Sequence, residues 1–167
     1  MLTHHWKYAM NSGKSGNRRL ARELAVKILF SLHHGSDNLG RVFDDFWANF
    51  RFAEDVLGDA VEDGPPPADR VRHFVEELVS GIADELDAID RELAASAANW
   101  SLSRMAQVDL AILRLAAYEL MFRKDIPARV TINEAIEIGK RFGAKETPAF
   151  VNGILDRIAH QYRGSDQ

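Results

Sequence analysis

Cysteine is absent from this chain of 167 residues. Without cysteine the protein cannot form a disulfide, a thiol nucleophile or a cysteine-based zinc site. The chain also lacks a run of about 18 apolar residues, so no segment can cross a membrane as an apolar helix. Because the opening residues are too polar for a signal peptide, we expect a cytoplasmic globular domain without membrane contact.

Sequence motifs of the common enzyme classes are lacking as well. There is no glycine-rich phosphate-binding loop, no HExxH zinc motif and no Gly-x-Ser-x-Gly nucleophile elbow. His33 and His34 are adjacent, so on a helix they point about 100° apart and cannot bind one metal ion together. We therefore expect no catalytic residues, no metal site and no cofactor.

Charge is distributed unevenly along the chain, although the formal net charge is −4. The segment 14–27 is basic and contains a single acid, whereas the middle of the chain is rich in aspartate and glutamate. Residues 1–16 have the composition of a flexible leader, and the prolines at 65–67 indicate an extended linker. We expect one folded domain at 17–163 and a short tail at 164–167.

Seven segments carry apolar residues at helical spacing, and no segment alternates with the period of a strand. The expected helices lie at about 18–34, 39–56, 69–82, 84–97, 108–122, 131–143 and 147–158. The fifth of them is apolar on nearly every side, which predicts a central helix that several neighbours bury. The sequence therefore predicts an all-α fold with seven helices.

Several polar residues have expected structural roles. Ser103 is a suitable N-cap for the central helix, and Thr131 has the spacing of a capping box with the glutamate that follows. Thr147 before a proline is typical of the start of a helix. Arg114 and Glu119 on the central helix need partners, because an unpaired buried charge costs several kcal/mol.

The basic residues of the first expected helix surround an aromatic ring on the helical wheel. Arg19, Arg22 and Lys27 share one half of the helix, and Phe30 lies among them. Such a face can bind single-stranded RNA, because guanidinium groups contact phosphates while the ring stacks on an unpaired base. The alternative is a solvated face on which Arg19, Glu23 and Lys27 form a charge ladder, and from this helix alone it is the favoured interpretation.

Three longer blocks carry a more specific pattern. They read RRLARELAVKILF at 18–30, VDLAILRLAAYEL at 108–120 and IPARVTINEAIEIGKRFGAKETPAFVNGILDRIA at 126–159. In this order they resemble the transcription antitermination factor NusB family. The resemblance implies a seven-helix protein with two packed helical subdomains, at about 17–100 and 101–163.

The resemblance also implies a function. Members of the family are non-enzymatic adaptors that bind single-stranded boxA RNA together with the ribosomal protein NusE. The resulting assembly joins an RNA polymerase complex that suppresses termination, chiefly in ribosomal RNA operons. Asp109, at the start of the central helix, resembles the acid that meets NusE, and its place in the first helical turn also favours accessibility.

The RNA-binding residues that the resemblance implies lie in two places. The arginine-rich first helix of the family touches RNA, and Leu20 replaces an arginine that relatives often carry there. Phe30 and Phe150 correspond to candidate base platforms, although Phe150 is equally well interpreted as a core residue. Together with the lysines, the expected RNA-binding set comprises Arg18, Arg19, Arg22, Lys27, Phe30, Lys145 and Phe150.

Two other functions remain open at this point. A NusB-like domain also serves as the RNA-targeting part of ribosomal RNA cytosine methyltransferases, but a chain of 167 residues leaves no room for a methyl-donor domain. The chain can also be a helical bundle that binds only protein, for example as a homodimer, with its basic helix masked by the acidic middle. RNA binding by the monomer distinguishes the adaptor from this bundle.

Overall fold

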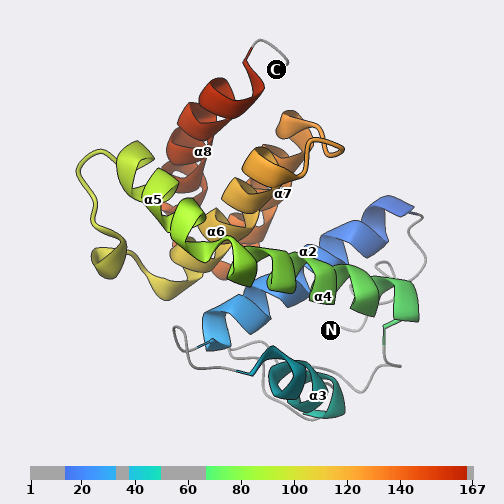
Figure 1. The fold of residues 1–167 in the computed structure, drawn as a ribbon. Coiled ribbons are helices and arrows are strands. Elements are labelled where there is room, and N and C mark those ends of the chain that lie inside the picture. The colour runs from blue at the N-terminus through green and yellow to red at the C-terminus, as the bar shows by residue number, and fades with distance from the viewer. Residues whose placement is uncertain (1–13, 33–37, 50–66, 165–167) are drawn as a thin grey trace. The chain divides into compact units, whose positions relative to one another are not determined.

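The computed structural model describes residues 14–32, 38–49 and 67–164. Within these ranges the chain forms seven α-helices and one turn of 3-10 helix, without a strand (Figure 1). The elements are α2 (Lys14–Ser31), α3 (Leu39–Asn49), α4 (Asp69–Asp84), α5 (Leu86–Ser96), η1 (Leu102–Arg104), α6 (Gln107–Phe122), α7 (Ala128–Phe142) and α8 (Thr147–Arg163). The predicted all-α fold with seven helices is confirmed. The histidine pair at 33–34, most of the leader and nearly all of the linker and tail lie outside the described residues.

The chain divides into two compact units, Met1–Ser80 and Gly81–Gln167. This division falls within α4, whereas the sequence predicted a division near residue 100. The difference arises because α5, which ends at Ser96, contacts α6 and α8 and so packs with the C-terminal helices. The C-terminal unit therefore begins earlier in the chain than the sequence indicated.

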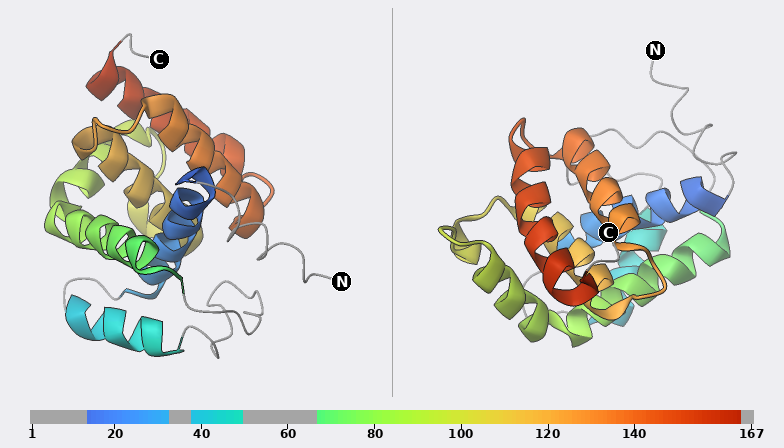
Figure 2. Two further views of the ribbon diagram at one scale, coloured as in Figure 1. Left: turned by 90° about the vertical axis from the view of Figure 1, so that its right-hand side faces the viewer. Right: turned by 90° about the horizontal axis from the view of Figure 1, so that it is seen from above.

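Helix α6 forms the centre of the C-terminal unit. Every residue from Leu110 to Leu120 except Arg114 is buried, and α6 contacts α5, α7 and α8 (Figure 2). An apolar surface on all sides of a helix is removed from water only when several elements cover it. The prediction of an enclosed central helix is confirmed.

The charged residues of α6 have partners within the C-terminal unit, as predicted. The Nε and Nη2 atoms of Arg114 donate to the two carboxylate oxygens of Asp90 on α5, each at 2.9 Å. Glu119 is 1% exposed and accepts a hydrogen bond from Thr131 Oγ1 at 3.0 Å. These contacts offset the cost of removing the charged groups from water.

Two of the three predicted helix starts are wrong. Thr131 is not an N-cap, because α7 already begins at Ala128 and the Thr131 hydroxyl is used by Glu119. Ser103 lies in η1, and the residue that precedes α6 is Ala106. The start of α8 is confirmed to within one residue, with Thr147 in its first turn followed by proline.

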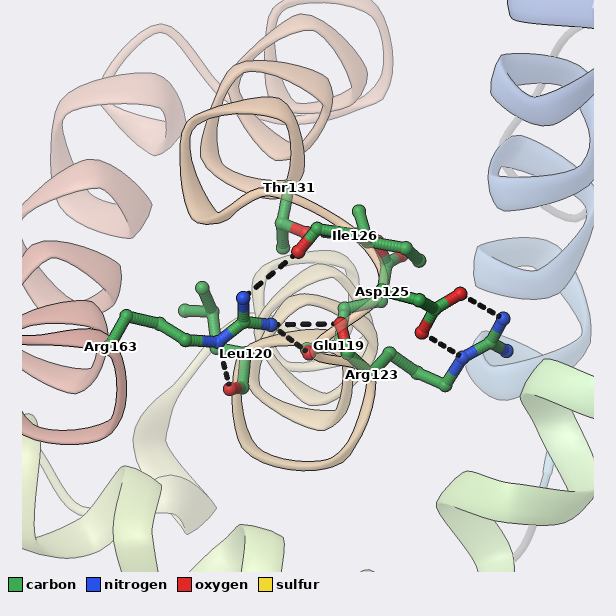
Figure 3. A network of polar contacts seen from close by, with 7 residues as sticks. All are labelled: Glu119, Leu120, Arg123, Asp125, Ile126, Thr131 and Arg163. Carbon is green, nitrogen blue, oxygen red and sulfur yellow. Dashed lines mark hydrogen bonds and ion pairs between the residues drawn. The ribbon is translucent and has the colours of Figure 1, made fainter. Parts of the chain in front are cut away.

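A single arginine near the end of α8 holds the C-terminal end of α6 (Figure 3). The guanidinium of Arg163 donates to four backbone carbonyls, those of Glu119, Leu120, Arg123 and Ile126, over distances of 2.8–3.0 Å. The last carbonyls of a helix lack partners within the helix and carry partial negative charge, so a cation there is favourable. The contact joins the end of α8 to the end of α6.

The first part of α4 provides the contacts between the helices of the N-terminal unit. The indole Nε1 of Trp47 on α3 donates to Glu76 Oε1 at 2.9 Å, and the Arg72 guanidinium lies 5.0 Å from the centre of the same indole. On α2, the Arg18 guanidinium lies 5.9 Å from the ring of Phe74. Both α2 and α3 therefore contact α4 within this unit.

Candidate nucleic-acid interface

The basic residues of α2 differ in how far they reach solvent. Arg18 and Arg19 are exposed, whereas Arg22 is 3% and Lys27 7% exposed. Glu23 is also buried, and the side chains of Arg19, Arg22, Glu23 and Lys27 all have interactions within the chain. The expectation that this face is solvated is therefore wrong, because Glu23 and Lys27 of the expected charge ladder are buried together with Arg22.

The burial of α2 explains this difference. All residues from Leu20 to Ile28 are buried, including Val26, which lies between Arg22 and Phe30 on the basic side of the helix. When apolar residues lie on the charged side of a helix as well as on its apolar side, other parts of the protein must cover both sides to remove these residues from water. The arginines that remain open to solvent, Arg18 and Arg19, come just before this buried stretch.

The aromatic residue expected near the end of α2 remains accessible. Phe30 is half-buried, and the neighbouring Ser31 is exposed and donates from its hydroxyl to the Ile28 carbonyl at 2.8 Å. A ring with one open face can stack on a base. The structure thus places Phe30 where the proposed stacking is sterically open, and the stacking itself stays a prediction.

Thr147 organises the connection between α7 and α8 in the C-terminal unit. Its hydroxyl accepts a hydrogen bond from the Ala144 backbone N–H at 3.0 Å and donates one to Asp109 Oδ1 at 2.7 Å. Asp109 is half-buried in the first turn of α6, so the predicted partner residue is already used inside the molecule. Lys145 lies on this connection and is exposed.

Phe150 packs against Trp100, which lies in the segment between α5 and η1. The centres of the Phe150 and Trp100 rings are 5.8 Å apart, with the ring planes at 73°. Edge-to-face contact of this kind is a favourable aromatic geometry. Trp100 is nevertheless 53% exposed, so much of its ring is available to another molecule.

The two rings border an open cleft of about 230 Å³. Its other lining residues are mostly small or apolar: Ala97, Ala98, Asn99, Gly153, Ile154 and Arg157. Nothing lies within 4 Å of the position of a Cβ at Gly153, so space remains open on that side of α8. Phe150 is half-buried and is therefore both packed and accessible, which combines the two interpretations of this residue.

Arg157 adds a positive charge to the cleft. Its Nη1 donates to the Ser96 carbonyl at 2.6 Å, which holds the exposed guanidinium beside the end of α5. Aromatic rings next to a guanidinium form the usual combination for stacking a base and attracting a phosphate. Neither Trp100 nor Arg157 was among the residues expected from the sequence, although a tryptophan in the short connection between two expected helices was a usable signal.

The cleft is supported by a polar cluster between α5 and α8. Glu92 Oε2 accepts hydrogen bonds from the Tyr162 hydroxyl at 3.0 Å and from Gln161 Nε2 at 3.3 Å. Burial raises the pKa of Tyr162 above its usual value of 10.0, and the hydrogen bond to Glu92 and its negative charge act in the same direction. The cluster holds α8 against α5, the helix that ends just before the cleft-lining residues 97–100.

Other kinds of site are not found in the part of the chain that the structure describes. No group of three or more histidine, aspartate or glutamate side chains there is arranged to hold a metal ion. No helix in those ranges has the length and apolarity needed to span a membrane. The described residues thus present cationic and aromatic surfaces rather than a metal centre.

Comparison with known proteins gives one consistent result. The sequence pattern of the NusB family matches residues 19–160. A protein of Syntrophotalea carbinolica named transcription antitermination protein NusB is 54% identical over 150 residues, covering 89% of this chain and 96% of that protein. A protein of the same name from Geobacter sulfurreducens is 44% identical over 144 residues, covering 86% and 94%.

Solved structures agree with the sequence comparison. NusB of T. maritima is 35% identical with a TM-score of 0.70, and the match covers 87% of this chain and 92% of that one. A structure described as antitermination factors NusB and NusE in complex with dsRNA has a TM-score of 0.69 at 22% identity, over 87% and 98%, which shows the shared fold. With most of the chain matched by sequence and structure, this protein belongs to the NusB family.

Proposed function

We propose that this protein is a transcription antitermination factor that binds boxA-type single-stranded RNA together with ribosomal protein NusE. In this role it links the RNA to transcribing RNA polymerase, chiefly in ribosomal RNA operons. The observation that carries the proposal is 54% identity to a transcription antitermination protein NusB over 96% of that protein's length. The neighbour described as a NusB and NusE complex with dsRNA supports the choice of both partners.

The C-terminal unit contributes stacking and charge to the proposed RNA surface. Trp100 and Phe150 offer ring faces to unpaired bases, while Arg157 and Lys145 attract phosphates. The N-terminus of α8 lies between Lys145 and Phe150, and the positive end of its helix dipole favours anions. This surface can bind a single strand without reading its sequence in a duplex groove.

The N-terminal unit contributes mainly charge. Arg18 and Arg19 are exposed and can contact phosphates directly, and Phe30 offers a further ring. Arg22 and Lys27, which are 3% and 7% exposed, act by supporting α2 unless RNA binding uncovers them. The small number of exposed cations predicts weak, salt-sensitive binding by the protein alone.

The partner protein strengthens this binding. A second RNA-binding surface held next to the first raises the effective concentration of each for the same strand. Asp109 is half-buried, so part of its carboxylate remains open to a cationic group of NusE. The protein then acts in the cytoplasm as an adaptor, without catalysis and without a cofactor.

Fluorescence anisotropy of a labelled boxA-type single strand tests this function. The titration is made with and without NusE at two salt concentrations, with a scrambled strand of equal length as the control. We expect salt-sensitive binding that tightens when NusE is added and that the scrambled strand does not reproduce. Absence of binding in both conditions would contradict the proposal and favour a bundle that binds only protein.

The oligomeric state is measured on the same sample. Sedimentation equilibrium in the absence of RNA distinguishes a monomer from a homodimer. If a homodimer forms, the RNA titration is repeated at protein concentrations below and above the dissociation constant of the homodimer. Binding by the monomer supports the adaptor function. Binding that only a homodimer shows would mean that a second copy, rather than NusE, completes the RNA surface.

A further inference from the structure

One carboxylate joins α6 to the element that carries part of the proposed RNA surface. Asp109 Oδ1 accepts a hydrogen bond from Thr147 Oγ1 at 2.7 Å, and the same hydroxyl accepts one from the Ala144 N–H at 3.0 Å. Asp109 and Thr147 are 38 residues apart in the sequence. Thr147 is 1% exposed, so solvent cannot easily replace either hydrogen bond.

The turn at 143–146 closes tightly on this threonine. A Cβ at Gly143 would lie 2.5 Å from Thr147 Oγ1, and a Cβ at Gly139 would lie 3.1 Å from Thr147 Cγ2. The approach at Gly143 is possible only because that position is glycine, while a side chain at Gly139 would push the Thr147 methyl aside by a few tenths of an ångström. The geometry of the turn therefore depends on the position of the Thr147 side chain, which Asp109 holds from α6.

The residues that this turn positions are those with proposed RNA contacts. Lys145 lies within the turn, and Phe150 lies one helical turn after Thr147, where its N–H donates to the Glu146 carbonyl at 3.1 Å. We propose that Asp109 is a positioning residue for RNA binding, which acts through Thr147 to fix the turn and the start of α8. This inference rests on the proposed function and adds a role within the molecule to the expected contact with NusE.

The two roles of Asp109 use different atoms. Oδ1 is occupied by Thr147, while Oδ2 has no hydrogen bond within the described part of the chain. A cationic group of a partner can therefore bind Oδ2 and leave the bond to Thr147 intact. Loss of the Thr147 hydroxyl should then weaken RNA binding while leaving the affinity for NusE unchanged.

The molecule contains a matched control for this pair. Thr131 on α7 is 2% exposed and donates to a carboxylate of α6, that of Glu119, at 3.0 Å. It resembles Thr147 in residue type, burial and acceptor, but it lies at the other end of α7 from the turn at 143–146. Thr131→Val should destabilise the protein at least as much as Thr147→Val, because it removes a hydrogen bond from a carboxylate that is only 1% exposed.

The test compares RNA affinity in Thr147→Val, Thr147→Ser and Thr131→Val, each without NusE, by anisotropy with the boxA-type strand. We expect about tenfold weaker binding for Thr147→Val, because a hydrogen bond to a charged group is lost, and restoration by Thr147→Ser. Thr131→Val should bind as the wild type does. Amide hydrogen exchange at Ala144 should accelerate in Thr147→Val alone.

A second pair of variants, at Asp109, tests the same role in case the Thr147→Val protein does not fold. Asp109→Asn keeps an oxygen that can accept from Thr147, whereas Asp109→Ala removes it, so RNA affinity should fall clearly only in the second. Equal RNA affinity in Thr147→Val and the wild type, or in the two Asp109 variants, would overturn the positioning role. A wild type that fails to bind the strand would instead refute the proposed function, and the inference with it.

Discussion

The two units present their candidate RNA surfaces by different means. In the N-terminal unit the candidate surface consists of charged residues on α2. Of these, Arg22 and Lys27 are buried, while Arg18 and Arg19 are exposed. In the C-terminal unit the candidate surface is formed by two aromatic rings, Trp100 and Phe150, beside an open cleft. Charge along a helix is readily seen in a sequence, but whether that charge reaches solvent depends on what packs against the helix.

This comparison separates two kinds of contribution to RNA binding. Phosphate contacts release counterions and so make the affinity depend on salt, whereas stacking of bases on rings depends on salt much less. The exposed arginines of α2 should therefore control the salt dependence. The rings of the cleft should control the part of the affinity that remains at high salt.

The largest expected effect tests whether Arg22 is structural. Arg22→Ala should lower the free energy of unfolding by about 3 kcal/mol or more, because it removes a buried charged side chain together with its interactions within the chain. Urea unfolding followed by circular dichroism measures the change. Arg19→Ala, an exposed neighbour on the same helix, is the control and should alter stability by less than about 1 kcal/mol.

If Arg22→Ala instead proves as stable as Arg19→Ala, the enclosure of α2 is not maintained in solution. The comparison between the two units would then disappear, because both candidate surfaces would be open. The corresponding RNA titration would show Arg22→Ala and Arg19→Ala losing affinity to a similar extent.

A smaller effect is expected at the cleft of the C-terminal unit. Trp100→Ala should weaken RNA binding by about 1–3 kcal/mol through loss of stacking, with the slope of log affinity against log salt unchanged. Phe122→Ala is the control, since Phe122 is also an exposed aromatic residue, at 41%, but is not among the residues that line the cleft. Equal losses in the two variants would show that the cleft has no specific part in RNA binding.

A single exposed arginine should have a smaller effect still. Arg19→Ala should reduce the slope of log affinity against log salt by about one, because one phosphate contact is lost. Its loss of affinity should shrink as salt rises, whereas the loss in Trp100→Ala should stay the same at every salt concentration. Anisotropy titrations of both variants over the same salt series measure the two slopes, and identical slopes would contradict the division between charge and stacking.

The sequence predicted the features of this molecule that depend on local pattern. The enclosed helix α6 followed from its apolar residues, and the pairing of Arg114 and Glu119 followed from the cost of burying a charge. Burial of Arg22 did not follow, because the neighbours of α2 are not encoded in α2 itself. Val26 on the basic side was the local sign that this side is covered.

Contacts between distant segments account for what the sequence did not reveal. The bond between Asp109 and Thr147 and the packing of Trp100 on Phe150 arise only when α6, α8 and the segment after α5 meet. Thr131 had the spacing of a helix cap, yet the buried acid Glu119 takes its hydroxyl. Local propensity is a weak guide wherever a tertiary partner competes for the same atom.

The smallest expected effect concerns the framework of the cleft and its dependence on pH. Because the pKa of Tyr162 is raised in the folded protein, its stabilising contribution is present below pH 10.0 and is lost as the pH rises through the folded value. Stability of the wild type should therefore fall more steeply above that pH than stability of Tyr162→Phe, which cannot ionise there. Urea unfolding of both proteins at pH 8 and at about pH 11 measures the difference. Parallel losses would mean that ionisation of Tyr162 does not disturb the contact between α5 and α8, and that other contacts, such as the bond from Arg157 to the Ser96 carbonyl, keep the shape of the cleft.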